Sequence, residues 1–96
     1  MRTLHLSSAA TADLSEISAY SLATFGPDAA RAYVRALDKV MDRLLYFPEL
    51  GCLMPALAQR PRCVPCNRDR IFYRVEGETI LVVRILHHKM SDAEWL

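Results

Sequence analysis

The last third of the chain constrains the fold most, because it contains two apolar segments that carry arginines within them. These segments cover residues 70–76 and 79–87, and Gly77 lies between them. Apolar segments of this length, separated by a glycine that can adopt positive φ, predict a β-hairpin. Arg74 and Arg84 lie inside the two predicted strands. Because an unpaired arginine is costly to bury, we expect each to have a partner or to face solvent.

The first half of the chain predicts a short strand followed by two helices. Apolar and polar residues alternate over 2–6, which is typical of a half-buried strand. Helical periodicity begins after two serines at 7–8, which are good N-cap residues, and ends at Phe25. A second helical stretch begins at Pro27, which suits the first position of a helix, and runs to Pro48. Two helices joined this closely are expected to form an antiparallel hairpin.

The remaining segments carry weaker signals. A loop follows the second helix, with a helical turn expected near 55–60. A strand is expected at 62–66, before the β-hairpin. Residues 90–96 predict a short tail, in which Ser91 is a candidate N-cap for one last turn.

The resulting order, β-α-α-β-β-β, predicts an α+β fold in one domain spanning residues 1–96. We expect the helical hairpin to cover one face of an antiparallel sheet, and the arginines to lie on the opposite, solvated face or at its rim. The helical residues expected to form the core are Leu14, Ile17, Tyr33, Leu37, Val40 and Leu44. Their expected partners in the sheet are Ile71 or Phe72, Ile80 or Leu81, and Ile85.

Composition predicts a small globular protein. The chain has 96 residues, of which 52% are apolar and 24% are charged, and a formal net charge of +1. This charge predicts no strong overall attraction to nucleic acid or to an anionic membrane. No apolar run reaches the ~20 residues of a membrane helix, and the first residues lack the features of a signal peptide. We therefore expect a cytoplasmic protein with reduced cysteines.

Two further patterns give weak indications of a chemical site. Cys63 and Cys66 form a CxxC sequence, but they lie in a predicted strand, where positions i and i+3 point to opposite faces. We interpret this spacing as coincidental and predict no metal site and no cofactor. His87 and His88 end the last strand. One interpretation is that these rings pack or are solvated; the other is a cationic rim that binds phosphate and transfers protons.

Arginines are concentrated between residues 60 and 74. This segment contains one acid, Asp69, and five arginines: Arg60, Arg62, Arg68, Arg70 and Arg74. A guanidinium group suits bidentate contacts with carboxylate or phosphate groups. The cluster therefore indicates either a surface that contacts a partner or a solvated face, and both interpretations stay open.

Many of these features occur in an order and spacing that match a known family. They are Ala12, Asp13, Leu14, Ile17 and Tyr20, then Phe25 and Gly26, then Ala30, Tyr33 and Leu37, then Pro48 and Gly51, and finally the segments 70–75 and 84–90. Together they resemble the ParE/RelE superfamily of bacterial type II toxins, and its ParE branch in particular. The resemblance covers nearly the whole chain.

The resemblance implies a toxin held inactive in a hetero-oligomer with a cognate, ParD-like antitoxin, whose C-terminal segment wraps the helices and the sheet. For the ParE branch it further implies inhibition of DNA gyrase, with no catalysis by the toxin. The expected antitoxin contacts, which pair arginines with acids of the partner, are Arg68, Arg70, Arg74 and Arg84.

The RelE branch implies a different activity, ribosome-dependent cleavage of mRNA. Its members use basic residues of the central strands and a C-terminal tyrosine or histidine–tyrosine pair. This chain has no lysine between Lys39 and Lys89 and no tyrosine after Tyr73, which favours the ParE branch. If the chain is a nuclease, Arg84 and His87 are the catalytic candidates, and only then is direct nucleic-acid binding expected. A third possibility is a non-toxic module that only binds its antitoxin.

Overall fold

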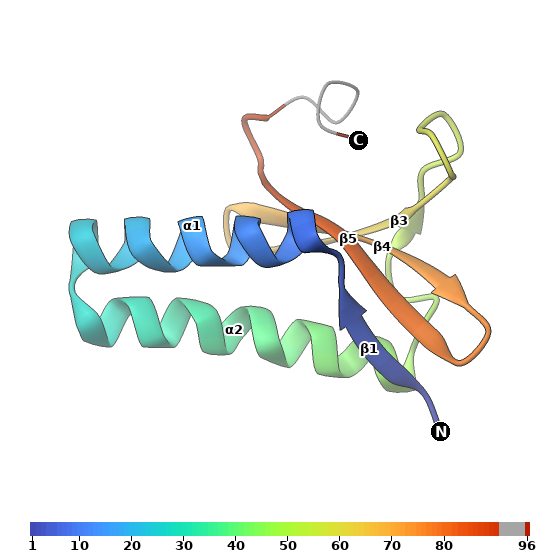
Figure 1. Cartoon of the computed structure of the whole chain (residues 1–96), viewed down its shortest axis with the longest axis horizontal. Helices are drawn as coiled ribbons and strands as arrows, with labels where there is room; N and C mark the ends of the chain where they lie inside the picture. The colour runs from blue at the N-terminus through green and yellow to red at the C-terminus, as the bar shows by residue number, and fades with distance from the viewer. Residues whose placement is uncertain (91–95) are drawn as a thin grey trace.

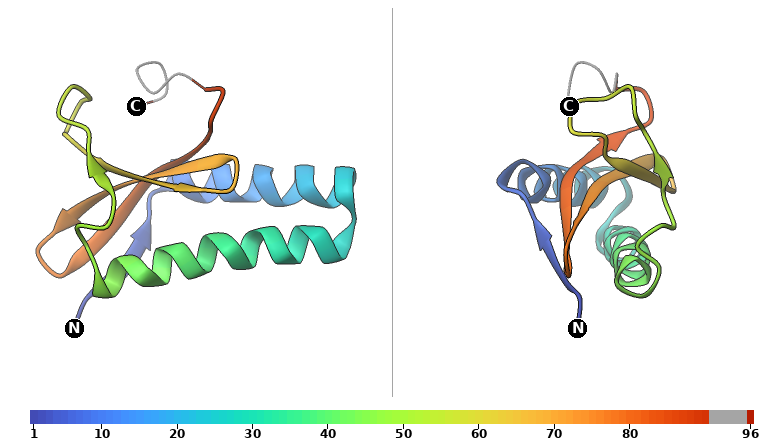
Figure 2. Two further views of the ribbon diagram at one scale, coloured as in Figure 1. Left: turned by 180° about the vertical axis from the view of Figure 1, so that it is seen from behind. Right: turned by 90° about the vertical axis from the view of Figure 1, so that its right-hand side faces the viewer.

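The computed structural model describes residues 1–90 and 96 and has an α+β architecture (Figure 1). In chain order its elements are β1 (Thr3–Leu6), α1 (Ser8–Phe25), α2 (Pro27–Tyr46), β2 (Cys52–Leu53), β3 (Arg62–Cys66), β4 (Asp69–Glu76) and β5 (Thr79–His87). The strands form a five-stranded sheet in the order β1-β5-β4-β3-β2. The helices form the predicted hairpin, and the end at which they connect projects beyond the sheet (Figure 1, Figure 2).

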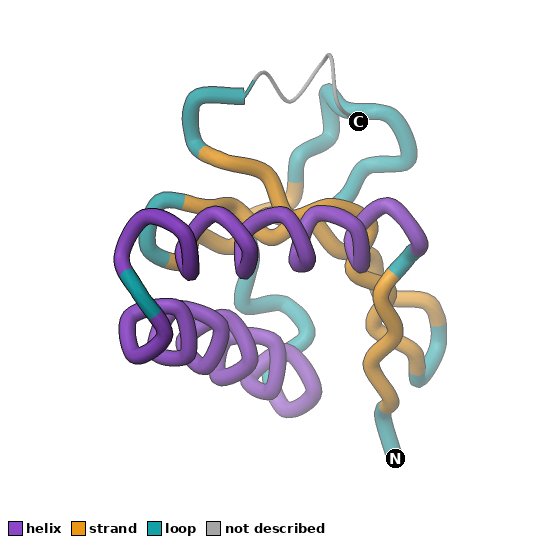
Figure 3. The backbone as a smooth tube through the Cα atoms, turned by 60° about the vertical axis from the view of Figure 1, so that its left-hand side comes forward, coloured by secondary structure: helices purple, strands orange, loops and turns teal. Residues whose placement is uncertain are grey.

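The sheet is mixed in strand direction. Strands β5, β4 and β3 pair antiparallel, as predicted, and the short β2, which was not predicted, pairs antiparallel with β3. Strand β1 instead pairs parallel with β5, with Thr3 opposite Thr79. This pairing arises because the chain leaves β1 through both helices and returns to the same edge only in its last strand (Figure 3). The α+β class and the helical layer are therefore confirmed, and the expectation of a wholly antiparallel sheet is corrected at the β1 edge.

Local sequence signals set the ends of the elements. The Ser7 hydroxyl oxygen accepts the N–H of Ala10 at 3.0 Å, which satisfies one of the unpaired amides at the start of α1. Gly26 has a φ of 90° and separates α1 from α2, whose first residue is Pro27. Gly77 has a φ of 61° in the turn between β4 and β5, which confirms its predicted role in the β-hairpin.

The loop after α2 differs from its prediction in two respects. It contains β2, a strand too short to show any periodicity in the sequence. Near 55–60 the chain makes two successive turns instead of a helical one: the N–H of Leu57 donates to the Met54 carbonyl at 3.2 Å, and the N–H of Arg60 donates to the Leu57 carbonyl at 3.1 Å. Ser91 and the predicted last turn lie outside the described residues.

The core lies between α2 and the facing side of the sheet. Leu37 and Leu44 are fully buried there, as predicted. Of the alternatives left open for the sheet, Ile71 and Ile80 belong to this core, and Ile85 belongs to it as predicted. The other predicted helical residues, Leu14, Ile17, Tyr33 and Val40, pack partly buried against it, and Met41 and Ala10 join it without having been predicted.

The opposite face of the sheet is less open than expected. Strand alternation places Arg70, Phe72 and Arg74 of β4 on this face, and Leu86 lies opposite Arg70 in the register. Phe72 and Leu86 are fully buried, so the expectation of a solvent-open face is wrong at these positions. One reason is that the Arg70 guanidinium carbon lies 5.3 Å from the centroid of the Phe72 ring, where an arginine side chain can cover apolar surface while its charge stays near water.

Candidate functional site

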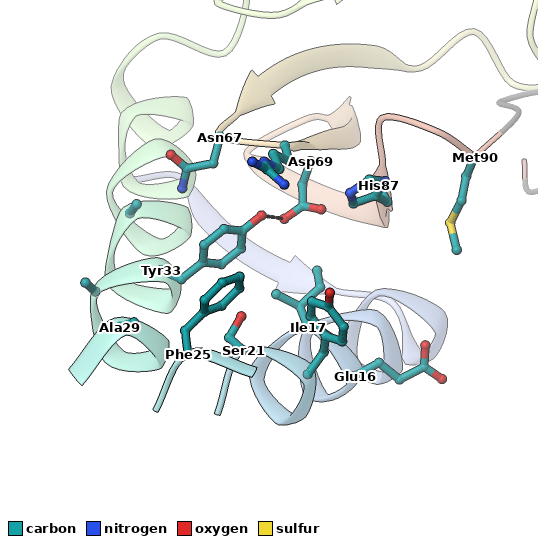
Figure 4. Close-up of a pocket in the computed structure, with 14 residues that line it drawn as sticks. Glu16, Ile17, Ser21, Phe25, Ala29, Tyr33, Asn67, Asp69, His87 and Met90 are labelled. Atoms are coloured by element: carbon teal, nitrogen blue, oxygen red, sulfur yellow. Dashed lines mark hydrogen bonds between the residues drawn. The ribbon is translucent and has the colours of Figure 1, made fainter. Parts of the chain in front are cut away.

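A groove of about 930 Å³ opens where the helical hairpin extends past the end of the sheet (Figure 4). Three sets of residues line it. Those from α1 are Glu16, Ile17, Tyr20, Ser21 and Phe25; those from α2 are Ala29, Ala32, Tyr33 and Ala36; those from the end of the sheet and the residues beside it are Asn67, Arg68, Asp69, His87 and Met90.

The groove is open because its α2 wall is built largely of alanines. Ala29 and Ala32 leave room between the two helices, and none of the strands β1 to β5 lies beside the end of the hairpin where α1 meets α2 (Figure 1). Tyr20 and Phe25 of α1 are 66% and 64% exposed, and their rings meet edge to face with centroids 6.4 Å apart. Exposed aromatic rings that border a groove are typical of a surface that binds a partner.

The inner end of the groove is polar. Asp69 begins β4 and pairs in register with His87 at the end of β5, so both side chains face the groove (Figure 4). The Tyr33 hydroxyl donates a hydrogen bond to the Asp69 carboxylate. Only 3% of the Asp69 residue is exposed. Burial, reinforced by this hydrogen bond, raises the pKa of Tyr33 above its ordinary value, so the phenol stays a neutral donor.

Arg84 is bound within the fold to Asp13 of α1. Its Nε and one terminal nitrogen each donate to the Asp13 carboxylate at 2.8 Å, and the Ile85 amide donates to the same carboxylate at 3.0 Å. The pairing between β1 and β5 ends at Val82. Beyond that residue, the Asp13 carboxylate takes the place of a strand and accepts the hydrogen bond of the Ile85 amide at the edge of β5. The hydrogen bond to Asp13 raises the pKa of Arg84, which keeps the guanidinium group charged.

The other predicted arginines lie in different surroundings. Arg70 donates to the carbonyl of Met90 at 2.7 Å. Arg74 forms an ion pair with Glu76 at 2.8 Å and also contacts Gln59. Arg68 is exposed and lines the groove. The four predicted arginines therefore occupy three places: the groove, the outer face of β4 and the β5–α1 contact.

The two nuclease candidates are not brought together. Arg84 lies opposite Phe72 and His87 lies opposite Asp69, so the arginine and the histidine start from opposite faces of β5. His87 instead stacks against His88, with ring centroids 4.3 Å apart. In the described part of the chain, no group of three or more histidine, cysteine or acidic side chains is arranged to hold a metal ion.

The CxxC cysteines also separate as predicted. Cys66 pairs with Asp69 in register and is buried in the core, where burial raises the pKa of its thiol. Cys63 lies opposite Phe72, on the other face of the sheet. No helix among residues 1–90 and 96 is both long enough and apolar enough to cross a bilayer.

Sequence reasoning missed the residues that tie these elements together. The Asp13–Arg84 pair joins residues 71 positions apart, and the Tyr33–Asp69 hydrogen bond joins residues 36 apart. No local period links such positions. For the groove a local signal exists, because Ala29, Ala32 and Ala36 lie on one side of α2 and line it.

The fold and the groove define a small α+β domain of the ParE/RelE type. The structure superposes with a TM-score of 0.77 on a solved chain titled "Chromosomal ParDE TA system from P. aeruginosa", which is 24% identical, with 91% of this chain and 96% of that chain covered. At this identity the match concerns the fold alone.

Sequence comparison identifies the family. A family described as "ParE toxin of type II toxin-antitoxin system, parDE" matches residues 4–92. The chain is 38% identical over 87 residues to a protein named Toxin ParE1 in two strains of Mycobacterium tuberculosis, covering 90% of this chain and 89% of the relative. It is 31% identical over 91 residues to a Toxin ParE1 of Caulobacter vibrioides, covering 95% and 94%. The chain belongs to the ParE toxin family of type II toxin-antitoxin systems.

Proposed function

We propose that this chain is a cytoplasmic toxin that a cognate, ParD-like antitoxin neutralises by inserting an apolar segment into the groove. The observation that carries the proposal is the groove itself, with alanines on one wall and the exposed rings of Tyr20 and Phe25 on the other. An amphipathic helix fits such a surface, because its apolar side chains gain contacts with both walls. In this complex the toxin and antitoxin form a hetero-oligomer.

We further propose that the toxin acts by binding a protein target, DNA gyrase, without catalysing a reaction. Membership of the ParE family supports this target. The geometry of the nuclease candidates supports a non-catalytic action, because Arg84 is occupied by Asp13 and lies on the opposite face of β5 from His87. A general acid–base pair needs both groups within reach of one reacting site.

Expression of the chain without an antitoxin is expected to stop bacterial growth, with filamentation and a DNA-damage response, because gyrase inhibition leaves broken or unreplicated DNA. Growth curves, microscopy and a damage reporter measure these effects. Ribosome-dependent cuts in mRNA, lost on changing Arg84→Ala or His87→Ala in a folded protein, would instead establish the RelE-like activity. If growth is unchanged although expression of the chain is confirmed, the chain is a non-toxic module that only binds its antitoxin.

The groove itself is tested by filling it. Ala32→Trp is expected to weaken antitoxin binding at least ~tenfold, about 1.4 kcal/mol, because the indole occupies the space between the helices. Ala32 is exposed, so the change need not disturb the core. Ala23→Trp is the matched control, an exposed α1 alanine that does not line the groove. Calorimetric titration of both variants with the antitoxin measures the effect. Equal antitoxin affinity in the two variants would mean that the antitoxin binds outside the groove.

The arginine contacts are tested in the same titration. If Arg68, Arg70 and Arg74 pair with acids of the antitoxin, at least one of the three alanine variants should lose binding ~tenfold or more. Arg43→Ala serves as the control, since this arginine is exposed near the end of α2 and outside the groove. Unchanged affinity in all three variants would mean that apolar contacts alone hold the antitoxin. Arg84 is left out, because its loss also breaks the contact with Asp13.

A further inference from the structure

The three cysteines of the chain are thiols, and two of them face each other across paired strands. Cys52 of β2 lies opposite Cys63 of β3 in the antiparallel register, which puts both side chains on the same face of the sheet. Cys66, the other half of the CxxC sequence, is buried on the opposite face. The neighbour of Cys63 that matters for thiol chemistry is therefore Cys52, eleven positions earlier in the chain.

The expected Cα spacing of the Cys52–Cys63 pair lies within the range that disulfides span. The N–H of Met54 donates to the Pro61 carbonyl at 2.8 Å, so Met54 and Pro61 form a hydrogen-bonded pair. Hydrogen-bonded and non-hydrogen-bonded pairs alternate along an antiparallel ladder. Cys52 and Cys63, two residues along the same register, are therefore also a hydrogen-bonded pair. Opposite Cα atoms in such a pair are about 5.5 Å apart. Disulfides span Cα separations of about 4.4–6.8 Å.

The backbone beside Cys52 is held against the sheet by hydrogen bonds with side chains of β3 and β4. The Gly51 N–H donates to the Tyr73 hydroxyl at 2.8 Å, and Arg62 donates to the Gly51 carbonyl at 2.9 Å. A Cβ at Gly51 would lie 2.8 Å from the Tyr73 ring and 2.9 Å from the Cys63 carbonyl oxygen, so only glycine allows this approach. These contacts hold the Cys52 backbone in register with Cys63 before any bond forms.

We propose that Cys52 and Cys63 form an oxidisable dithiol that a peroxide closes into a cross-strand disulfide, fastening β2 to β3. The exposed Cys52 sulfur attacks a peroxide oxygen; an S–O bond forms, the O–O bond breaks, and water leaves. The Cys63 sulfur then attacks the Cys52 sulfur; the S–S bond forms, the S–O bond breaks, and a second water leaves. Two thiols are oxidised and one hydrogen peroxide is reduced to two waters.

The same geometry makes the bond reversible. Cβ atoms in a hydrogen-bonded pair stand near 5.5 Å, whereas a disulfide needs them at about 3.5–4.5 Å, so β2 must move toward β3. A two-residue edge strand can make that movement, but it stores strain. Strained, exposed disulfides are the readily reduced ones, so a dithiol reductant is expected to reopen this one.

The test uses the whole chain at low protein concentration, first reduced and then treated with hydrogen peroxide. We expect a monomer that has lost two hydrogen atoms, protection of Cys52 and Cys63 from alkylation, a higher thermal midpoint than the reduced form, and full reversal by dithiothreitol. Tryptic cleavage after Arg62 separates Cys52 from the peptide that holds the other two cysteines, so the cross-linked peptides can be identified.

Cys66→Ser is the matched control, because it removes the remaining thiol and should leave the oxidised product unchanged. Cys63→Ser should abolish it. Disulfide-linked dimers through Cys52, a bond that includes Cys66, or peroxide oxidation of Cys52 to sulfinic acid with no bond would each overturn the proposal. If a serine variant fails to fold, the alkylation pattern of the unaltered chain still decides among these outcomes.

Discussion

Replacing Leu37 by alanine is expected to lower the free energy of unfolding by about 2–5 kcal/mol. The Leu37 side chain is fully buried and belongs to the cluster that α2 forms with the sheet. The loss combines the apolar surface no longer removed from water with the cavity left behind. Because small domains are stable by only about 5–15 kcal/mol, the change takes a large share of the total.

Urea unfolding of the isolated chain, followed by circular dichroism, measures the Leu37→Ala effect. Leu22→Ala is the matched control: the same atoms are removed from a helix, but Leu22 is 53% exposed, so the cost should be much smaller. If Leu37→Ala changes the free energy of unfolding by less than about half a kcal/mol, this face of α2 is not core.

The parts of the fold that the sequence predicts are those encoded by neighbouring residues. The N-cap at Ser7, the start of α2 at Pro27 and the turn at Gly77 each depend on a few adjacent positions. The parallel pairing of β1 depends instead on contacts with β5, which lies at the other end of the chain. Strand β2 has only two residues, too few to show an alternation of apolar and polar side chains. Both were missed because only tertiary contacts determine them.

The candidate site follows the same division. The cost of burying an unpaired arginine predicted that Arg74 and Arg84 each have a partner or face solvent, and both form ion pairs, with Glu76 and Asp13. The groove was not predictable in shape, because it needs the two helices and the sheet end to meet at defined positions. Its polar end arises from the β4–β5 register, which puts Asp69 opposite His87, and from Tyr33 reaching in from α2.

The second large effect is expected at the contact between α1 and β5. Asp13→Ala should lower the free energy of unfolding by roughly 2–4 kcal/mol, somewhat less than breaking a fully buried pair. The Asp13 and Arg84 side chains are 11% and 20% exposed, so water replaces little of what is lost. The variant leaves Arg84 without its carboxylate and the Ile85 amide without its acceptor.

A double-mutant cycle isolates the pair. Asp13→Ala, Arg84→Ala and the double variant, compared in urea so that the denaturant adds no salt, should give a coupling energy of about 0.5–3 kcal/mol. Asp28→Ala is the control, since its pair with Arg31 is exposed and should contribute little. Purely additive single effects would mean that Asp13 and Arg84 do not depend on each other. A large coupling would mean that loss of toxicity in Arg84→Ala reports on folding, so that a catalytic role for this arginine needs a variant whose stability is intact.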